Sequence, residues 1–314
     1  MGMRLAYVFP GQGAQYVGMG VELADRCPQS RALFLQASEV LGFDLLALCA
    51  GGPEEALQQT ANAQPAILTA SVACLVALRP HVPPPALTAG LSLGEYTALV
   101  ASGAIQFEDA VRVVRLRGMA MQEATGDRDV TMAAILGLRP EVVEEVCREV
   151  VEWGTCEVSN YNAPDQVVIG GDRAAVEEAV RRLKACGARR AVPLAVSTAF
   201  HTSLMRPAAE RLAAVLEAVP MRDPDVPVVS NVTAEPVYRA TDIRRLLVEQ
   251  VTRPVRWAQS VRRMAQEGVD TFLEIGPGKV LSGLIRRQVD GAMTLSVEDW
   301  ATLESARRTF EAFR

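Results

Sequence analysis

Residues 86–101 read ALTAGLSLGEYTALVA, and this segment decides the fold. Ala86 to Leu91 has the apolar character of a short buried strand, Ser92 to Gly94 form a tight turn, and helical spacing resumes at Glu95. The turn fits the pattern Gly-x-Ser-x-Gly, in which two glycines allow a sharp turn and leave the serine hydroxyl exposed at the start of a helix. An ordinary glycine-rich turn would match the same five residues. The strand before it and the helix after it favour a nucleophile elbow.

A serine at such an elbow needs a base, because its hydroxyl is a weak nucleophile until a neighbour takes the proton. The chain has two histidines, and His81 lies in a proline-rich loop, where it is most simply solvent-exposed. His201 ends the segment VSTAFH at residues 196–201, between a predicted strand and a predicted helix. An α/β sheet presents ligand-facing groups at such junctions. We therefore predict that His201 is the base for Ser92.

One arginine lies on the apolar side of a predicted helix over residues 108–124. At about 100° per residue, Arg117 falls in the middle of an apolar stripe, and the other members of the stripe are Ala110, Val113, Val114, Ala120, Met121 and Ala124. Arg112 and Arg115 fall on the opposite side, as expected of solvated charges. A buried guanidinium needs an anion, because an unpaired buried charge is very costly. Arg117 therefore forms either a structural ion pair or a bidentate clamp for a substrate carboxylate.

The order of elements predicts two units within an α/β fold. A β-α-β-β-α-β order is typical of a ferredoxin-like unit, and its expected elements are strands at 131–137, 156–161, 166–169 and 189–194 and helices at 140–151 and 172–186, the second capped by Asp172. We predict this subdomain at residues 128–197, inserted into a larger body formed by residues 1–127 and 198–314. Alternating strands and helices in the body predict a mainly parallel sheet flanked by helices.

Composition excludes several classes of protein. The net charge of −5 gives no overall basic field, which argues against a nucleic-acid partner. The six cysteines contain no C-x-x-C pair, so we expect neither a metal site nor a disulfide framework. The apolar runs at residues 5–9 and 66–78 are too short for an export signal and a membrane span. We expect a cytoplasmic protein that does not enter a membrane.

Taken together, these segments resemble the malonyl-CoA:acyl carrier protein transacylases of fatty-acid and polyketide synthesis. The similarity extends from Leu5 to Val297. Its matching stretches are Val8-Phe9-Pro10-Gly11-Gln12-Gly13, Ser92-Leu93-Gly94-Glu95-Tyr96, Arg117 with Met121-Gln122-Glu123-Ala124, Asn160-Tyr161-Asn162, Ala199-Phe200-His201, Gln250, and Glu274-Ile275-Gly276-Pro277-Gly278-Lys279. The resemblance implies a hydrolase-like α/β body with an inserted ferredoxin-like (βαββαβ) subdomain, in agreement with the division above.

The resemblance also implies a mechanism. Ser92 would be the acylated nucleophile and His201 its base, with the backbone carbonyl of Gln250 orienting the imidazole. The backbone N–H groups of Gln12 and Leu93 would form the oxyanion hole. The course would be ping-pong, from coenzyme A to serine and then to the thiol of the carrier. Malonyl-CoA would be a substrate, and no cofactor or metal would be required.

The substrate pocket implied by the resemblance is formed by four side chains. Arg117 would bind the malonyl carboxylate, and Met121 and Asn162 would line the pocket. Phe200 resembles the residue of malonyl-selective relatives, and its ring should crowd a branched α-carbon, which favours malonyl over methylmalonyl. Leu91 is a departure, since many relatives have histidine immediately before the nucleophile. That histidine is not their general base, so the mechanism is expected to hold.

The expected partner is a holo, phosphopantetheinylated acyl carrier protein, which is usually acidic. Because this chain is acidic too, docking should use local arginines, and the candidates are Arg189, Arg190, Arg286 and Arg287. Ordinary solvated charges would look the same. We expect a monomer. Three other functions remain open: a plain α/β-hydrolase such as a thioesterase, a non-catalytic carrier-binding scaffold, and a stand-alone acyltransferase of a polyketide synthase.

Overall fold

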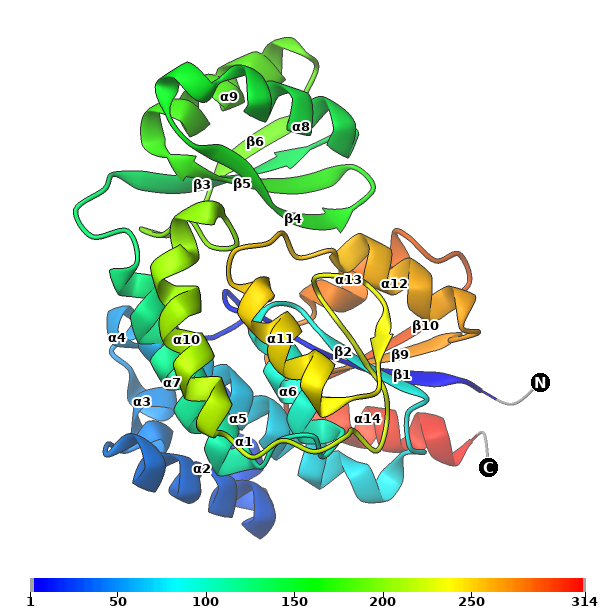
Figure 1. The fold of residues 1–314 in the computed structure, drawn as a ribbon. Coiled ribbons are helices and arrows are strands. Elements are labelled where there is room, and N and C mark those ends of the chain that lie inside the picture. Colours follow the sequence, from blue (N-terminus) through cyan, green and yellow to red (C-terminus); the bar gives the residue numbers. More distant parts are fainter. Residues whose placement is uncertain (1–2, 313–314) are drawn as a thin grey trace.

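The computed structural model describes residues 3–312, and its strands form two sheets (Figure 1). The strands of the larger sheet are β1 (Leu5–Phe9), β2 (Leu87–Gly90), β7 (Val228–Val229), β8 (Pro236–Val237), β9 (Thr271–Ile275) and β10 (Met293–Val297). Their spatial order is β10-β9-β1-β2-β7-β8. All neighbours are parallel except β7 and β8, which are antiparallel. The predicted mainly parallel α/β sheet is confirmed.

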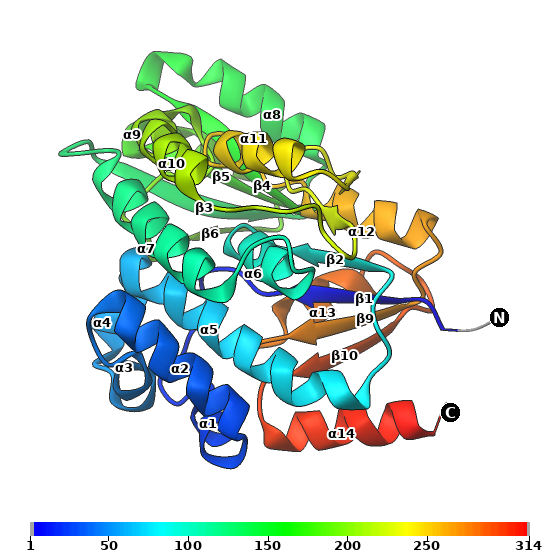
Figure 2. The ribbon, with the colours of Figure 1, turned by 60° about the horizontal axis from the view of Figure 1, so that its bottom comes forward.

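The central strand β1 is buried on both of its faces. Leu5, Tyr7 and Phe9 enter one apolar core, while Ala6 and Val8 enter another on the opposite face. Helices cover both sides, with α5 (Thr60–Leu78), α6 (Leu93–Ala101) and α7 (Phe107–Glu123) against the first core and α12 (Trp257–Gln266) and α13 (Val280–Arg286) against the second (Figure 2). This double coverage explains why β1 is a continuous apolar run rather than an alternating one.

The remaining helices of the body are α1 (Val21–Arg26), α2 (Pro28–Leu41), α3 (Leu45–Gly51), α4 (Glu54–Gln58), α10 (Arg206–Ala218), α11 (Ala240–Gln250) and α14 (Trp300–Glu311). Within residues 3–312, one helix, Thr60–His81, is long and apolar enough to cross a membrane, with a mean hydropathy of 1.5. However, 83% of its apolar window is buried inside the protein. It serves as the central helix of the first core.

The second sheet has four antiparallel strands in the order β4-β5-β3-β6, where β3 is Val130–Leu136, β4 is Cys156–Ala163, β5 is Gln166–Asp172 and β6 is Arg190–Pro193. Two helices, α8 (Pro140–Glu149) and α9 (Arg173–Ala185), lie on the face directed away from the body (Figure 1). The order β3-α8-β4-β5-α9-β6 matches the expected ferredoxin-like unit, and these elements enclose their own apolar core. We propose that the subdomain comprises residues 128–197.

The prediction that Asp172 caps the following helix is wrong in its chemistry. Asp172 occupies the N-cap position of α9, but its carboxylate makes no capping hydrogen bond. Its oxygens accept the N–H of Thr155 at 2.6 Å and bind the guanidinium of Arg128. These contacts lower the pKa of Asp172, and the hydrogen bond from Arg128 is the largest cause. The carboxylate therefore holds two loops of the subdomain together instead of capping the helix.

Backbone hydrogen bonds and a surface ion pair are among the contacts that fix the small sheet to the body. Val255, in the loop before α12, donates its N–H to the carbonyl of Ser159 at 2.9 Å and accepts the N–H of Tyr161 at 2.8 Å. On the surface, Asp165 binds Arg287 of the body. Because both contacts lie near the end of β4, this edge of the subdomain is held close to the carboxyl ends of the parallel strands, where α/β proteins bind their ligands.

Candidate active site

Ser92 lies at a strained turn between β2 and α6. Its backbone has φ 54° and ψ −103°, a conformation that residues other than glycine rarely adopt. The flanking glycines are required by space: a Cβ on Gly90 would be 1.9 Å from the carbonyl carbon of Gly94, and one on Gly94 would be 2.2 Å from the carbonyl oxygen of Phe9. The turn is also held from outside, because the Ser92 N–H donates to Asn231 Oδ1 at 2.7 Å.

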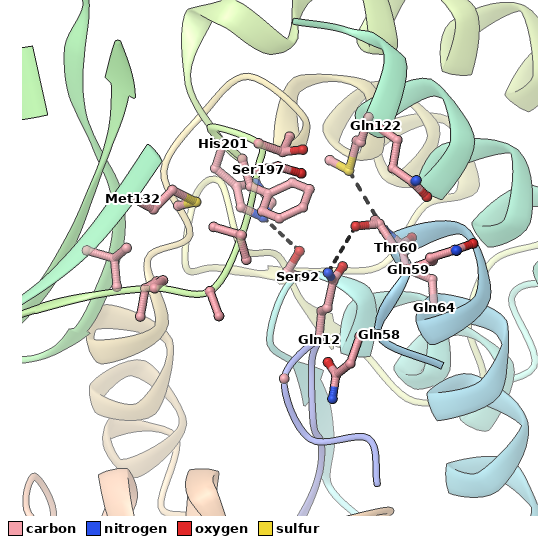
Figure 3. Close-up of a pocket in the computed structure, with 18 of the residues that line it drawn as sticks. Gln12, Gln58, Gln59, Thr60, Gln64, Ser92, Gln122, Met132, Ser197 and His201 are labelled. Carbon is pink, nitrogen blue, oxygen red and sulfur yellow. Dashed lines mark hydrogen bonds between the residues drawn. The ribbon is translucent and has the colours of Figure 1, made fainter. Parts of the chain in front are cut away.

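His201 reaches this serine from the loop that follows β6. Its Nε2 is 2.7 Å from Ser92 Oγ (Figure 3). Its Nδ1 is 2.7 Å from the carbonyl oxygen of Gln250. A carbonyl can only accept a hydrogen bond, so Nδ1 carries the proton and Nε2 is free to accept one. The side chain is 4% exposed. Burial and then the charge of Arg117 lower the pKa of His201 to about 3, against the opposing effect of the Gln250 carbonyl.

Arg117 lies on the buried face of α7, 2% exposed, and points at the same serine. Its guanidinium donates to Ser92 Oγ at 3.0 Å, to Gln64 Oε1 at 2.9 Å and to Gln250 Oε1 at 2.9 Å. Its Nε has no hydrogen-bond partner. Burial lowers the pKa of Arg117, but a guanidinium remains charged in proteins.

Within residues 3–312, Arg117 forms no ion pair with a carboxylate, and the side chains that accept its hydrogen bonds are neutral. The structural ion pair considered from the sequence is therefore absent from the described chain. A buried positive charge with unused donors beside a nucleophile is suited to binding an anion. The expected contrast with Arg115 is only partly correct, since Arg115 is half-buried and stacks 5.5 Å from the ring of Phe43.

A cavity of about 600 Å³ opens above Ser92, between the body and the small sheet. In Figure 3, Met132 of the small sheet lies across the cavity from Gln64 of α5. The predicted site residues that line it are Gln12, Ser92, Arg117, Met121, Asn162, Phe200 and His201. Leu93 and Gln250 lie beneath it, fully buried. Among the described residues, the backbone N–H groups of Gln12 and Leu93 donate to no protein acceptor, which leaves them free for a ligand oxygen.

The four predicted docking arginines are exposed and lie outside the cavity. Two of them are engaged, since Arg189 and Arg287 both bind the carboxylate of Asp165. Arg286 donates to the hydroxyl of Thr294 at 2.8 Å. Arg190 opens the edge strand β6, whose continuation at Leu194 lines the cavity.

The sequence interpretation missed three polar residues beside the site. Gln64 accepts from Arg117, Asn231 holds the Ser92 N–H, and Glu95 accepts from Gln250 Nε2 at 2.7 Å. Glu95 is 4% exposed, and burial raises its pKa to about 7 against the hydrogen bonds from Gln250 and Asn231 and the charge of Arg117. One signal was available, because Asn231 directly follows the predicted strand 226–230, at the end of a sheet where ligand-facing groups lie.

Metal ligation has no basis in this site. Within the residues that the structure describes, no three His, Cys, Asp or Glu side chains gather in a way that could hold a metal ion. The site places the hydroxyl of Ser92 within hydrogen-bonding distance of His201 and of the guanidinium of Arg117.

An elbow serine with a histidine base, on a parallel α/β sheet, defines a class of enzymes that work through a covalent serine ester. The model of the acyl transferase domain family matches residues 6–308, and the chain belongs to this family. The malonyl CoA-acyl carrier protein transacylase of Bacillus subtilis (strain 168) is 46% identical over 309 residues, covering 98% of both chains.

Solved structures agree with this assignment. The chain is similar to the malonyl CoA-acyl carrier protein transacylase from Coxiella burnetii, with a TM-score of 0.95, 39% identity and 98% coverage of both chains. It is also similar to a malonyl-transacylase in complex with its type II PKS acyl-carrier protein, with a TM-score of 0.95, 46% identity and coverage of 98% and 99%. The resemblance identified from the motifs is confirmed.

Proposed function

We propose that this protein transfers malonyl groups from coenzyme A to the phosphopantetheine thiol of a holo acyl carrier protein. One observation carries the proposal: the guanidinium of Arg117 is buried without a carboxylate partner and lies 3.0 Å from Ser92 Oγ. A malonyl thioester has a carboxylate two bonds from its reacting carbonyl. The site therefore has a cation where that carboxylate would lie when the carbonyl reaches the serine. The relatives of the same name support this assignment.

The reaction proceeds in two half-reactions. His201 Nε2 takes the proton of Ser92 Oγ as the oxygen attacks the thioester carbon, and the N–H groups of Gln12 and Leu93 hold the resulting oxyanion. Collapse breaks the carbon–sulfur bond, and the departing coenzyme A sulfur takes the proton from His201. The carrier thiol then gives its proton to His201 and attacks the malonyl-serine ester. The proton returns to Ser92 Oγ as the ester bond breaks.

Arg117 changes partners during this cycle. In the structure its guanidinium donates to Ser92 Oγ, so the serine hydroxyl must direct its own proton to His201. A bound malonyl carboxylate accepts from the guanidinium in a bidentate pair, stronger than the contact with a neutral hydroxyl. The same cation thus orients the nucleophile before binding and the substrate after it.

The geometry does not favour a plain hydrolase. An α/β-hydrolase is expected to orient its histidine with an acidic residue, whereas His201 Nδ1 faces the carbonyl of Gln250. A hydrolase also has no need of a buried cation beside the nucleophile. The strained turn at Ser92 and the 2.7 Å distance between Ser92 Oγ and His201 Nε2 also argue against a non-catalytic scaffold, which needs neither feature.

The experiment that tests the function is a two-substrate rate measurement with malonyl-CoA and holo carrier protein. We expect parallel lines in double-reciprocal plots, as a ping-pong course requires, and malonyl on the carrier thiol. Release of free malonate at the same rate without a carrier would refute the proposal. The polyketide alternative is supported by the likeness to a transacylase solved with a type II PKS carrier. Carriers of both pathways should therefore be compared.

We further propose that the protein acts in the cytoplasm as a monomer. Its partners are malonyl-CoA and the carrier protein, and it requires no nucleic acid, membrane, cofactor or metal. The names of the relatives, which include a carrier-bound complex, support the carrier as partner.

Phe200 is expected to set selectivity against branched acyl groups. Its ring lines the cavity next to the base His201, and its carbonyl is fixed by the hydroxyl of Ser159 at 2.8 Å. Phe200→Ala should raise the relative rate for methylmalonyl-CoA about tenfold, because one methyl group in a pocket contributes about that much discrimination. Competition between the two thioesters measures the ratio. Comparable turnover of malonyl-CoA and methylmalonyl-CoA by the wild-type protein would contradict the role assigned to Phe200.

Charge reversal separates docking arginines from structural ones. Arg190→Glu with Arg286→Glu should raise the KM for carrier protein roughly tenfold and leave that for malonyl-CoA unchanged, because rim charges act mainly on encounter. Arg189 and Arg287 need a stability control, since their reversal also breaks the ion pairs with Asp165. If the KM for the carrier is unchanged in Arg190→Glu with Arg286→Glu and also in Arg189→Glu with Arg287→Glu, none of the four arginines belongs to the docking surface.

A further inference from the structure

The side chain of Gln250 has contacts that are separate from the role of its backbone. The backbone carbonyl accepts from His201, while the side-chain amide, fully buried, lies between Arg117 and Glu95. Its Oε1 accepts from the guanidinium at 2.9 Å, and its Nε2 donates to the carboxylate at 2.7 Å. The three side chains form a continuous line from α7 through α11 to α6.

The two ends of this line allow one orientation of the amide. A guanidinium has donors only, so the amide oxygen of Gln250 must face Arg117, and the amide nitrogen then faces Glu95, whose oxygen accepts its N–H. The opposite orientation would place the donors of the amide against the donors of Arg117. The charge of the guanidinium makes its hydrogen bond to the amide oxygen stronger than a neutral one.

Glu95 also stabilises the turn at Ser92, through Asn231. The oxygen that accepts from Gln250 accepts the N–H of Asn231 at 3.2 Å, and Asn231 accepts the N–H of Ser92 at 2.7 Å. The titratable groups that interact with this carboxylate are Arg117 of α7 and Tyr96 of α6. Arg117 is the only cation among them. Glu95 is therefore linked to the cation of the pocket and to the nucleophile, without touching the cavity.

We propose that Glu95 and the side-chain amide of Gln250 are positioning residues that hold the guanidinium of Arg117 for a substrate carboxylate. They thereby set the preference of Ser92 for acyl groups that carry a carboxylate. This inference rests on the proposed function. It adds that the selectivity for malonyl depends on residues that touch neither the acyl group nor the reacting atoms.

The test compares two thioesters in two variants. Glu95→Gln replaces the carboxylate that accepts from Gln250 Nε2 by a neutral amide, and Gln250→Met removes the side-chain amide but keeps the backbone carbonyl that His201 needs. Initial rates of Ser92 acylation with malonyl-CoA and with acetyl-CoA are followed by intact mass. We expect the malonyl-to-acetyl ratio to fall about tenfold in each variant, the effect of one lost charge-assisted hydrogen bond. A purely structural role would lower both rates together.

A matched control is Thr97→Val, two residues from Glu95 on α6. Thr97 is fully buried, and its hydroxyl has no hydrogen-bond partner, so this change should leave the ratio as it is. If Glu95→Gln does not fold, Gln250→Met still decides the question. A folded variant that keeps the wild-type ratio would overturn the inference alone. A wild type that is acylated by neither thioester would overturn the proposed function, and the inference with it.

Discussion

Replacing His201 by alanine is expected to lower the rate of Ser92 acylation by at least about 10⁴-fold, the effect of removing the base from a serine nucleophile. The imidazole nitrogen 2.7 Å from Ser92 Oγ is the only base at the serine among the described residues. Without it, the hydroxyl proton has no acceptor and the departing thiolate has no donor. Single-turnover acylation by malonyl-CoA, followed by mass, measures the effect.

The second histidine of the chain is the matched control. His81 lies in the short helix Arg79–His81 and does not line the cavity, so His81→Ala should leave the rate unchanged. The pH dependence gives a second test. Because the pKa of His201 is lowered to about 3, the base is neutral at every pH well above that value. In Glu95→Gln, which removes the other group of the site with a pKa near neutrality, the rate at saturating acetyl-CoA should therefore stay level between about pH 8 and pH 5. A fall in that variant near the ordinary histidine pKa of about 6.5 would contradict a buried neutral base.

Replacing Arg117 by alanine is expected to lower acylation by malonyl-CoA about 10³-fold, because the substrate carboxylate would then be buried without a counter-charge. Acylation by acetyl-CoA should fall much less. Arg117→Lys should restore only part of the malonyl rate, since an ammonium group cannot form the bidentate pair of a guanidinium. Rates for both thioesters in the three proteins provide the measurement.

The control for this prediction lies on the same helix. Arg115 donates to Asn62 and does not line the cavity, so Arg115→Ala should leave the ratio of the two rates unchanged. Equal losses for malonyl and acetyl in Arg117→Ala would mean that the guanidinium serves only to orient Ser92. The assignment of Arg117 to the substrate carboxylate would then fail.

The elbow, the histidine and the arginine could be predicted because each has a local signal. A Cβ at position 90 or 94 would lie only 1.9 or 2.2 Å from backbone atoms, so both positions require glycine and the turn is specified within five residues. Arg117 interrupts an apolar helical stripe. In each case, the spacing along the chain places the side chain, and the chemistry follows from the residue type.

The polar residues that support the elbow could not be predicted in the same way. Asn231 reaches Ser92 because β2 pairs with β7, although the two residues are 139 positions apart. Glu95 lies on a helix that is buried on nearly all sides, where a carboxylate leaves no periodic signal. Asp165, which binds arginines of both units, likewise depends on how the subdomain is placed against the body. Such contacts follow from tertiary packing, which one sequence does not reveal.

The most direct test of the central claim is the intact mass of the protein after brief exposure to malonyl-CoA, with Ser92→Ala measured beside it. The account predicts a gain of one malonyl group on the wild type only, removed when holo carrier protein is added. A wild type that gains no mass while free malonate accumulates would contradict the account. So would a malonyl adduct that also forms on Ser92→Ala.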